Sequence, residues 1–174
     1  MGTPLKRMQR ALALQDVFVL RAEAHLDHEF DPKYTKENLG VQIKFATNED
    51  VEHFELSNDS NPNQKITVLR FSIDTGVRFV ALGKEVDEKP LVRAEITATF
   101  AADYLIKQKD GVDDEGVTAF AQNVVYHVWP YWREFIHTTS GRLRLPGAIL
   151  PMFQPKKTAT EDTQNEQEPL PTEY

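Results

Sequence analysis

Hydrophobic and polar residues alternate along several stretches of the first hundred residues. Successive side chains of a β-strand point to opposite faces, so this alternation predicts strands with one buried side and one side facing solvent. The clearest stretch is 92–100, where Val, Ala, Ile, Ala and Phe alternate with Arg, Glu, Thr and Thr. The predicted strands are 17–26, 41–47, 65–82 and 92–100, and 51–56 can continue the second after an irregularity at Asn48.

The alternation also assigns faces within the first predicted strand. Phe18 and Leu20 fall on the same side as Ala22 and the even-numbered residues that follow, whereas Arg21 and Glu23 fall on the opposite side. We therefore expect Phe18 and Leu20 to share a face with the rest of the apolar side of this strand.

The segments around the strands differ in length and composition. Residues 27–40 hold Pro and Gly among charges and are long for a hairpin turn, so we expect an excursion between strands. Residues 58–64, Asn-Asp-Ser-Asn-Pro-Asn-Gln, have the composition of a turn, and 84–90 are a charged turn. Residues 1–14 are either a short amphipathic helix or a loose arm.

One long helix is predicted over residues 113–145. Asp113 can cap its first turn, and Gly141 can take the left-handed conformation that ends a helix, with Pro146 beyond it. Apolar residues recur at intervals of three, four and seven, which places them on one stripe. They are Val117, Phe120, Ala121, Val124, Val128, Tyr131, Trp132 and Phe135.

Two features of this helix depart from a simple pattern. Pro130 lacks an N–H group and clashes with the preceding turn, so it predicts a kink or a split in the helix. Tyr126, Trp129 and Ile136 lie off the stripe and suggest a second apolar flank, which one sheet cannot bury. Such a flank usually meets another subunit or a partner.

The order of these elements, strands first and helix last, predicts an α+β fold: a four-stranded antiparallel sheet covered by one long C-terminal helix. A chain of 174 residues suffices for one domain. Residues 146–153 are apolar but interrupted by prolines. Residues 154–174 are polar and are expected to be disordered. The predicted division is an arm at 1–14, a domain at 15–153 and a tail at 154–174.

The amino-acid composition limits the functions that the chain can have. The net charge of −7 argues against general nucleic-acid binding, and the lack of cysteine excludes disulfides and thiolate chemistry and suits a cytosolic protein. The apolar run at 11–14 is too short for a signal peptide or a membrane span. His25 and His28 are three residues apart, which would suit a metal site on a helix, but at a strand end they point to opposite faces. No catalytic elbow or phosphate-binding loop is present. We therefore expect no catalytic residue and no metal site.

The end of the predicted helix carries a distinctive run of residues. It reads Trp-Pro-Tyr-Trp-Arg-Glu-Phe at 129–135, then Thr-Ser-Gly-Arg-Leu at 139–143 and Leu-Pro at 145–146. This run resembles the Pro-Tyr-x-Arg-Glu helix and the succeeding Gly and Pro of SecB-type chaperones. The order of four strands and a helix, with a long crossover between the first two strands, is similar to the SecB fold across residues 15–153. Glu95 and Tyr104 stand where the family has a Glu and a later aromatic residue.

The chain also departs from export-type members of that family. Residues 100–102 read Phe-Ala-Ala where the family commonly has a Gly and bulky apolar residues. The outward sheet face, which is acidic where SecA docks, is here mixed in charge: Arg21, Glu23, Arg70, Asp74, Arg78 and Arg93. The pair Asp103-Tyr104 and the run 139–146 look more like SecB-like chaperones associated with toxin–antitoxin systems.

The resemblance implies a cytoplasmic, ATP-independent holdase that forms a homotetramer, a dimer of dimers, without membrane insertion. Such a holdase requires no cofactor. It would bind unfolded polypeptides, either preproteins delivered to SecA or an antitoxin, in long apolar grooves. The residues expected to contact a client are Phe18, Leu20, Phe45, Phe100, Tyr104, Tyr126, Trp129 and Trp132. The alternatives are a structural or adaptor oligomer that does not bind clients, and a hydrolase or small-ligand protein.

Overall fold

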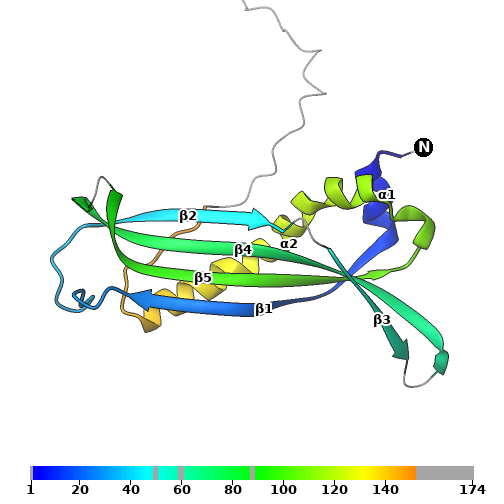
Figure 1. Cartoon of the computed structure of the whole chain (residues 1–174), viewed down its shortest axis with the longest axis horizontal. Coiled ribbons are helices and arrows are strands. Elements are labelled where there is room, and N and C mark those ends of the chain that lie inside the picture. Colours follow the sequence, from blue (N-terminus) through cyan, green and yellow to red (C-terminus); the bar gives the residue numbers. More distant parts are fainter. Residues whose placement is uncertain (1, 49–50, 59–60, 87–88, 152–174) are drawn as a thin grey trace, which may run out of the picture.

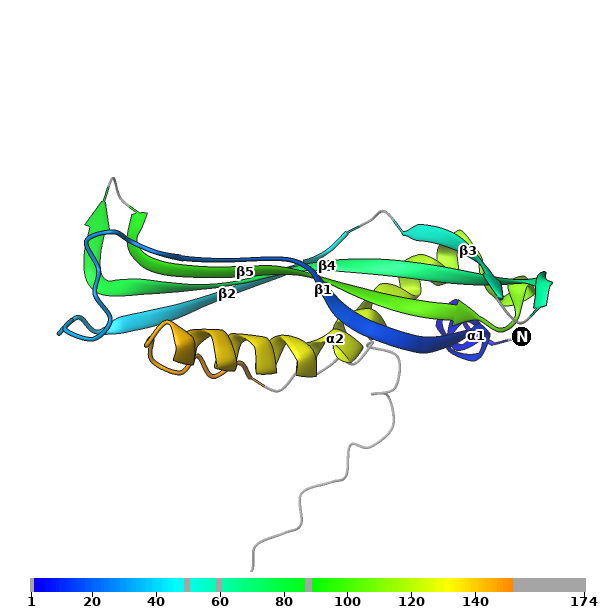
Figure 2. The same ribbon diagram turned by 90° about the horizontal axis from the view of Figure 1, so that it is seen from below.

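A long, twisted antiparallel sheet forms one layer of the molecule and a single long helix lies against one of its faces (Figure 1, Figure 2). The computed structural model describes residues 2–48, 51–58, 61–86 and 89–151. The elements in order are α1 (Pro4–Ala11), β1 (Leu12–Leu26), β2 (Leu39–Thr47), β3 (Glu52–Asn58), β4 (Asn61–Val86), β5 (Lys89–Ile106), a 3-10 turn (Lys109–Gly111) and α2 (Asp114–Arg142). The α+β class and the sheet-then-helix order are confirmed.

The strands are arranged in the order β1-β5-β4-β2, and β3 also pairs with β4. β2 and β3 follow one another along the same edge of β4, because Thr47 pairs with Ile73 and Glu52 pairs with Arg70. The predicted continuation of the second strand is therefore a separate strand on that edge. α1 occupies part of the segment expected to be a helix or an arm, and β1 begins directly after it. The predicted tail, 154–174, lies outside the described residues.

One prediction about β1 is wrong. Val19 and Arg21 lie opposite two consecutive residues of β5, so Leu20 is an extra residue in the strand. Such a bulge shifts the alternation by one position. Phe18 therefore faces the side of the sheet that α2 does not cover, whereas Ala22 faces α2. The sequence pattern assumed an uninterrupted period of two and could not reveal the shift.

The core lies between α2 and one face of the two central strands. Hydrophobic side chains at odd positions of β4 and even positions of β5 point toward the helix and are buried, and burial of each large one contributes about 1.5–3 kcal/mol. They include Leu69, Phe71, Ile73, Val77, Phe79, Ala94, Ile96, Phe100 and Tyr104, and they meet Phe120, Val124, Val128, Trp132 and Ile136 of α2.

The start of α2 is capped as expected, but its end is not. The carboxylate of Asp113 accepts a 2.7 Å hydrogen bond from the N–H of Gly116 and pairs with Arg7, and both contacts lower the pKa of Asp113. The helix runs through Gly141, and the left-handed residue is Arg144, with φ of 58°. The N–H of Leu145 then bonds to the carbonyl of Ser140, so a buried leucine follows the turn and closes the helix.

α2 continues as one helix through Pro130 and bends near the middle of its length (Figure 2). The predicted stripe is wrong at several positions. Tyr131 is exposed, whereas Trp129 and Ile136, which were assigned to a second flank, are buried. The reason is that residues 145–151 return along α2 and cover this flank, which the sequence pattern of the helix alone does not show.

Candidate functional site

An aromatic cluster lies where α2 meets the edge of the sheet. We define it as Phe45 of β2 with Trp129 and Trp132 of α2. The two indole rings are 4.8 Å apart and perpendicular, and the ring of Phe45 lies 5.6 Å from Trp129 and 6.3 Å from Trp132. Edge-to-face pairs of this kind contribute about 0.5–1.5 kcal/mol each beyond their burial. Trp132 is 1% exposed and Phe45 is 47% exposed, so the cluster connects the core to solvent.

A row of apolar side chains on β2 extends the cluster. Val41 and Ile43 point to the same face as Phe45, and all of these side chains are exposed. They remain exposed because β2 is the outermost strand here, so the helix covers the central strands and does not reach over it. Within the described part of the chain, β2 has a strand neighbour on one side only. An exposed edge strand with an apolar face is a surface that folded proteins usually protect.

The segment 145–151 forms the other side of this region. Its Leu145, Ala148 and Leu150 are buried, and the indole Nε1 of Trp129 donates a 2.9 Å hydrogen bond to the carbonyl oxygen of Pro151. Ile149 is 88% exposed.

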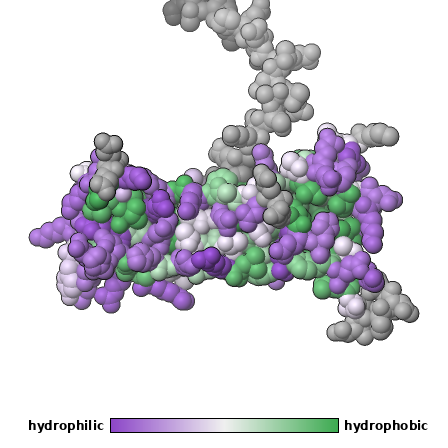
Figure 3. Space-filling view, in the orientation of Figure 1, coloured by the Kyte–Doolittle hydropathy of each residue, from purple (hydrophilic) through white to green (hydrophobic). Residues whose placement is uncertain are grey.

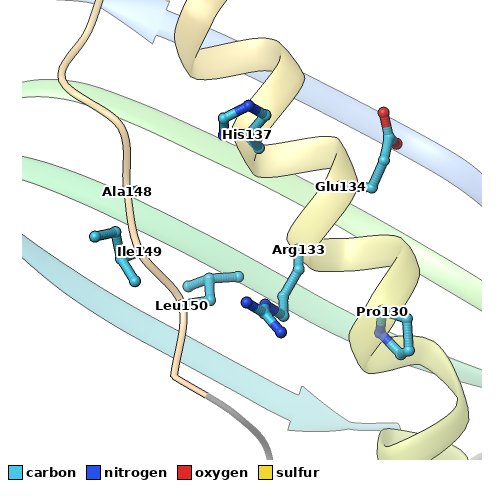
Figure 4. Close-up of a pocket in the computed structure, with 7 residues that line it drawn as sticks. All are labelled: Pro130, Arg133, Glu134, His137, Ala148, Ile149 and Leu150. Carbon is cyan, nitrogen blue, oxygen red and sulfur yellow. The ribbon is translucent and has the colours of Figure 1, made fainter.

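Between this segment and α2 lies an open pocket of about 400 Å³ (Figure 4). Its lining mixes charged and apolar side chains: Pro130, Arg133, Glu134, His137, Ala148, Ile149 and Leu150.

Tyr126 is the remaining predicted aromatic residue of α2, and its ring lies 5.9 Å from that of His127. It lies one helical turn before Trp129 on α2 and is 57% exposed. Of the residues predicted to contact a client, the structure therefore brings three together, Phe45, Trp129 and Trp132, and Tyr126 lies one helical turn away on α2. Val41, Ile43 and Ile149 were not predicted for this region. The alternation shared by Val41, Ile43 and Phe45 was a signal for the first two, but the edge position of β2 was not visible in the sequence.

Phe100 and Tyr104 lie in the core. The ring of Phe100 packs edge-on against Phe135, and Tyr104 is enclosed by Phe71 and Phe120. The hydroxyl of Tyr104 lies 2.8 Å from Nδ1 of His127. Burial raises the pKa of Tyr104 and lowers the pKa of His127, which favours the neutral form of each. Neither predicted residue presents its side chain at the surface of the described chain.

Phe18 and Leu20 lie on β1, at the opposite edge of the sheet from Phe45. Leu20 is exposed at the bulge. Phe18 packs against the guanidinium of Arg70, whose carbon lies 4.9 Å from the ring centroid. The structure does not bring these two residues to the aromatic cluster.

On the uncovered face of the sheet, charged side chains of β4 form ion pairs with charged side chains of the neighbouring strand β5. Arg70 binds Asp103 through two hydrogen bonds of 2.7 and 2.8 Å, and Arg78 binds Glu95 at 2.8 Å. Figure 3, which views this face, shows polar and apolar residues interspersed over it. Among the described residues, the positive and negative charges expected on this face from the sequence therefore largely pair with one another.

Within the described ranges, no three His, Asp or Glu side chains converge closely enough to hold a metal ion. None of the helices in those ranges has the length and apolar character needed to cross a membrane.

No protein-family model and no curated protein sequence matches this chain. Among solved structures, it is similar to the SecB-like chaperone Rv1957 of Mycobacterium tuberculosis, solved in complex with a ChAD peptide from the antitoxin HigA1 (Rv1956). The TM-score is 0.65 at 20% sequence identity, over 88% of this chain and 99% of that chain. A protein of unknown function from Streptococcus agalactiae matches over 80% of this chain and 96% of its own, with 12% identity and a TM-score of 0.32, too low to support an argument. The protein has the SecB-like fold.

Proposed function

We propose that this protein is an ATP-independent chaperone that holds non-native polypeptides against the aromatic cluster and the apolar row of β2. The observation that carries the proposal is the exposed side of Phe45, which joins the row formed with Val41 and Ile43 to the tryptophans beneath. A similar fold that binds an antitoxin peptide supports it.

The physical basis is burial of apolar surface by many weak contacts. Each Å² of apolar area removed from water contributes about 25 cal/mol, so a client that covers several exposed side chains is held without nucleotide hydrolysis. The outer backbone of β2 offers N–H and C=O groups to an extended chain, which gains hydrogen bonds independent of client sequence. This proposed mode of action requires no cofactor and no catalytic residue.

The client class we favour is an antitoxin segment, with an export preprotein as the alternative. The paired charges of the uncovered face, such as Arg70–Asp103 and Arg78–Glu95, leave little net charge there to attract a motor protein such as SecA. The solved chaperone of similar fold is bound to an antitoxin peptide. We further propose a cytoplasmic homotetramer, built as a dimer of dimers, as the working form.

A second candidate is a structural oligomer in which another copy of the chain covers the apolar row. The exposed edge of β2 favours this reading as well, because an open edge can pair with a second copy. The two candidates differ in one property: only the chaperone binds unfolded chains once its own assembly is complete.

The test is light scattering while a chemically unfolded protein is diluted into buffer, with the chaperone present and no nucleotide. We expect stoichiometric suppression of aggregation, and weaker suppression by Phe45→Ser. The matched control is Leu56→Ser, since Leu56 is 52% exposed on the same edge of β4 but faces the uncovered side. If the protein is a folded oligomer by size-exclusion chromatography but several clients aggregate as fast with it as without it, the chaperone proposal is wrong. The structural oligomer is then the remaining candidate.

A further inference from the structure

A second open pocket lies at the end of the molecule opposite α1, where the crossover between β1 and β2 comes close to the end of α2 (Figure 1, Figure 2). We call it the crossover pocket. Its volume is about 470 Å³, within the range of pockets that bind ligands. Leu26, Phe30 and Leu143 supply apolar surface, and Arg142 and Arg144 line the side formed by the end of α2.

These two arginines differ from those of the sheet. Arg70, Arg78 and Arg93 each bind a carboxylate. Arg142 and Arg144 are exposed, and neither has an ion-pair partner in the part of the chain that the structure describes. Their positive charges are therefore available to a ligand.

The acidic side chains across the pocket have partners within their own loop. The carboxylate of Asp31 accepts a 2.9 Å hydrogen bond from the N–H of Lys33, and Glu29 lies 3.7 Å from the ring of His28. The crossover thus contributes apolar surface to the pocket and leaves the charge of the arginines to be matched from outside.

The backbone does not explain why residue 144 is an arginine. Its φ is 58°, a left-handed conformation that glycine or asparagine adopts at a lower cost in free energy. Arg142 lies in the last turn of α2, where a cation also stabilises the helix dipole. A test must separate that structural role from binding.

We propose that the crossover pocket binds an extended peptide segment in which an apolar side chain is followed by carboxylates. The apolar side chain lies against Phe30 and Leu143, and the carboxylates pair with Arg142 and Arg144, because guanidinium groups bind carboxylates through paired hydrogen bonds. In a chain of net charge −7, such a pair is a local exception that favours an acidic ligand.

The inference deepens the proposed function and rests on it for the identity of the peptide as a client. A helix rises about 1.5 Å per residue, so Arg142 lies about 15 Å along α2 from Trp132. About five residues of extended chain span that distance. One client can therefore reach both the aromatic cluster and the crossover pocket, and the proposal specifies clients that carry acidic residues beside apolar ones.

The test compares two fluorescein-labelled peptides by fluorescence anisotropy. Both have Gly-Ser repeats around a central sequence, which is Leu-Phe-Asp-Glu in one and Leu-Phe-Asn-Gln in the other. We expect the full-length protein to bind the acidic peptide about 5- to 30-fold more tightly, the preference that two partly exposed ion pairs give. The double variant Arg142→Gln, Arg144→Gln should bind both peptides equally.

Two further variants separate charge and stability from binding. Lys6→Gln, Arg10→Gln removes the same charge from α1, at the other end of the molecule, and should keep the preference. Arg144→Gly suits the left-handed backbone, so it should lose part of the preference without lowering the melting temperature.

Equal affinity of the parent protein for the two peptides, or a preference that persists in the folded double variant, overturns the inference. If the protein suppresses aggregation in the light-scattering test but shows no preference, only this inference fails. If it prefers the acidic peptide and loses that preference in the double variant, but does not suppress aggregation, the peptide site is supported and the proposed function fails.

Discussion

The two faces of the sheet place aromatic rings in different settings. On the face toward α2, Phe45 packs against the two tryptophans and leaves apolar surface exposed beside an edge strand. On the uncovered face, Phe18 and Phe54 pack against the guanidinium of Arg70, which Asp103 holds through two hydrogen bonds. The first arrangement leaves Phe45 47% exposed, whereas the second places each ring against a cation that is already paired. An aromatic residue near the surface therefore suits the proposed client contact only where apolar area remains exposed to water.

A second arginine, Arg93, has a similar set of partners at the irregularity where β5 and β4 shift register. Arg93 binds Asp27 at 2.6 Å and Glu37 at 2.7 Å, and its guanidinium carbon lies 5.9 Å from the centroid of Phe30. Lys84 also binds Glu37 at 2.7 Å. These contacts fix the crossover between β1 and β2 against the sheet, so here too the charges serve the fold.

The largest effect is expected when the cluster loses its buried member. Trp132→Ala should lower the free energy of unfolding by about 3–5 kcal/mol, because it opens a large cavity in the core. Trp132→Phe should lower the free energy of unfolding by less than the alanine variant does. The buried indole N–H of Trp132 has no hydrogen-bond partner among the described residues, so its removal breaks no hydrogen bond. Urea unfolding followed by circular dichroism measures both. A loss below 1 kcal/mol for the alanine variant would show that the cluster is not continuous with the core.

A smaller effect is expected on the other face. Arg70→Met should lower the free energy of unfolding by about 1–2 kcal/mol, between the values for exposed and for fully buried ion pairs, because Asp103 keeps a half-buried charge without its partner. The affinity for an unfolded probe should not change. Arg21→Met is the control, since its pair with Glu23 is exposed. If the folded Arg70→Met variant binds the unfolded probe more weakly, the uncovered face also takes part in binding, and the proposed difference between the two faces is wrong.

The crossover should respond to acid. Hydrogen bonds from Arg93 and then Lys84 lower the pKa of Glu37 from 4.5 to about 2. A carboxyl whose pKa is lower in the folded than in the unfolded chain adds stability that is present above its unfolded pKa and lost as pH falls through the folded one. Stability should therefore decline between about pH 5 and pH 2, and less steeply in Glu37→Gln. Glu29→Gln, an exposed carboxyl in the same crossover, is the control, and equal slopes in all three proteins would contradict the assignment.

Local patterns predicted most of the fold. The alternation at 92–100 and the helical stripe around Phe120 and Val124 correspond to β5 and α2, because each depends on neighbours in sequence. The errors arose where tertiary contacts decide. The bulge at Leu20 inserts one residue that no pattern marks, and Arg144 takes the left-handed position because the following Leu145 must reach the core.

The candidate site was predictable only in part for the same reason. Phe45, Trp129 and Trp132 could be identified as aromatic residues on elements that pack together. Which of them reaches solvent depends on the order of the strands and on the return of residues 145–151 along α2. Phe100 is equally aromatic and lies in the core, so residue type alone does not separate a binding surface from its support.

The smallest change in stability should separate binding from folding most clearly. Ile43→Thr keeps a β-branched residue in β2, so the strand should remain intact and the free energy of unfolding should change by less than about 0.5 kcal/mol. The variant removes apolar atoms that a client would cover, at about 0.8 kcal/mol per methylene equivalent, so probe affinity should fall about 4- to 15-fold. Gln42→Thr, the next residue on the same strand, points to the other face and should leave affinity unchanged. If Ile43→Thr and Gln42→Thr weaken binding equally, the client contacts the backbone edge of β2 and not its apolar face. The difference between the covered and the uncovered face of the sheet would then not apply to β2.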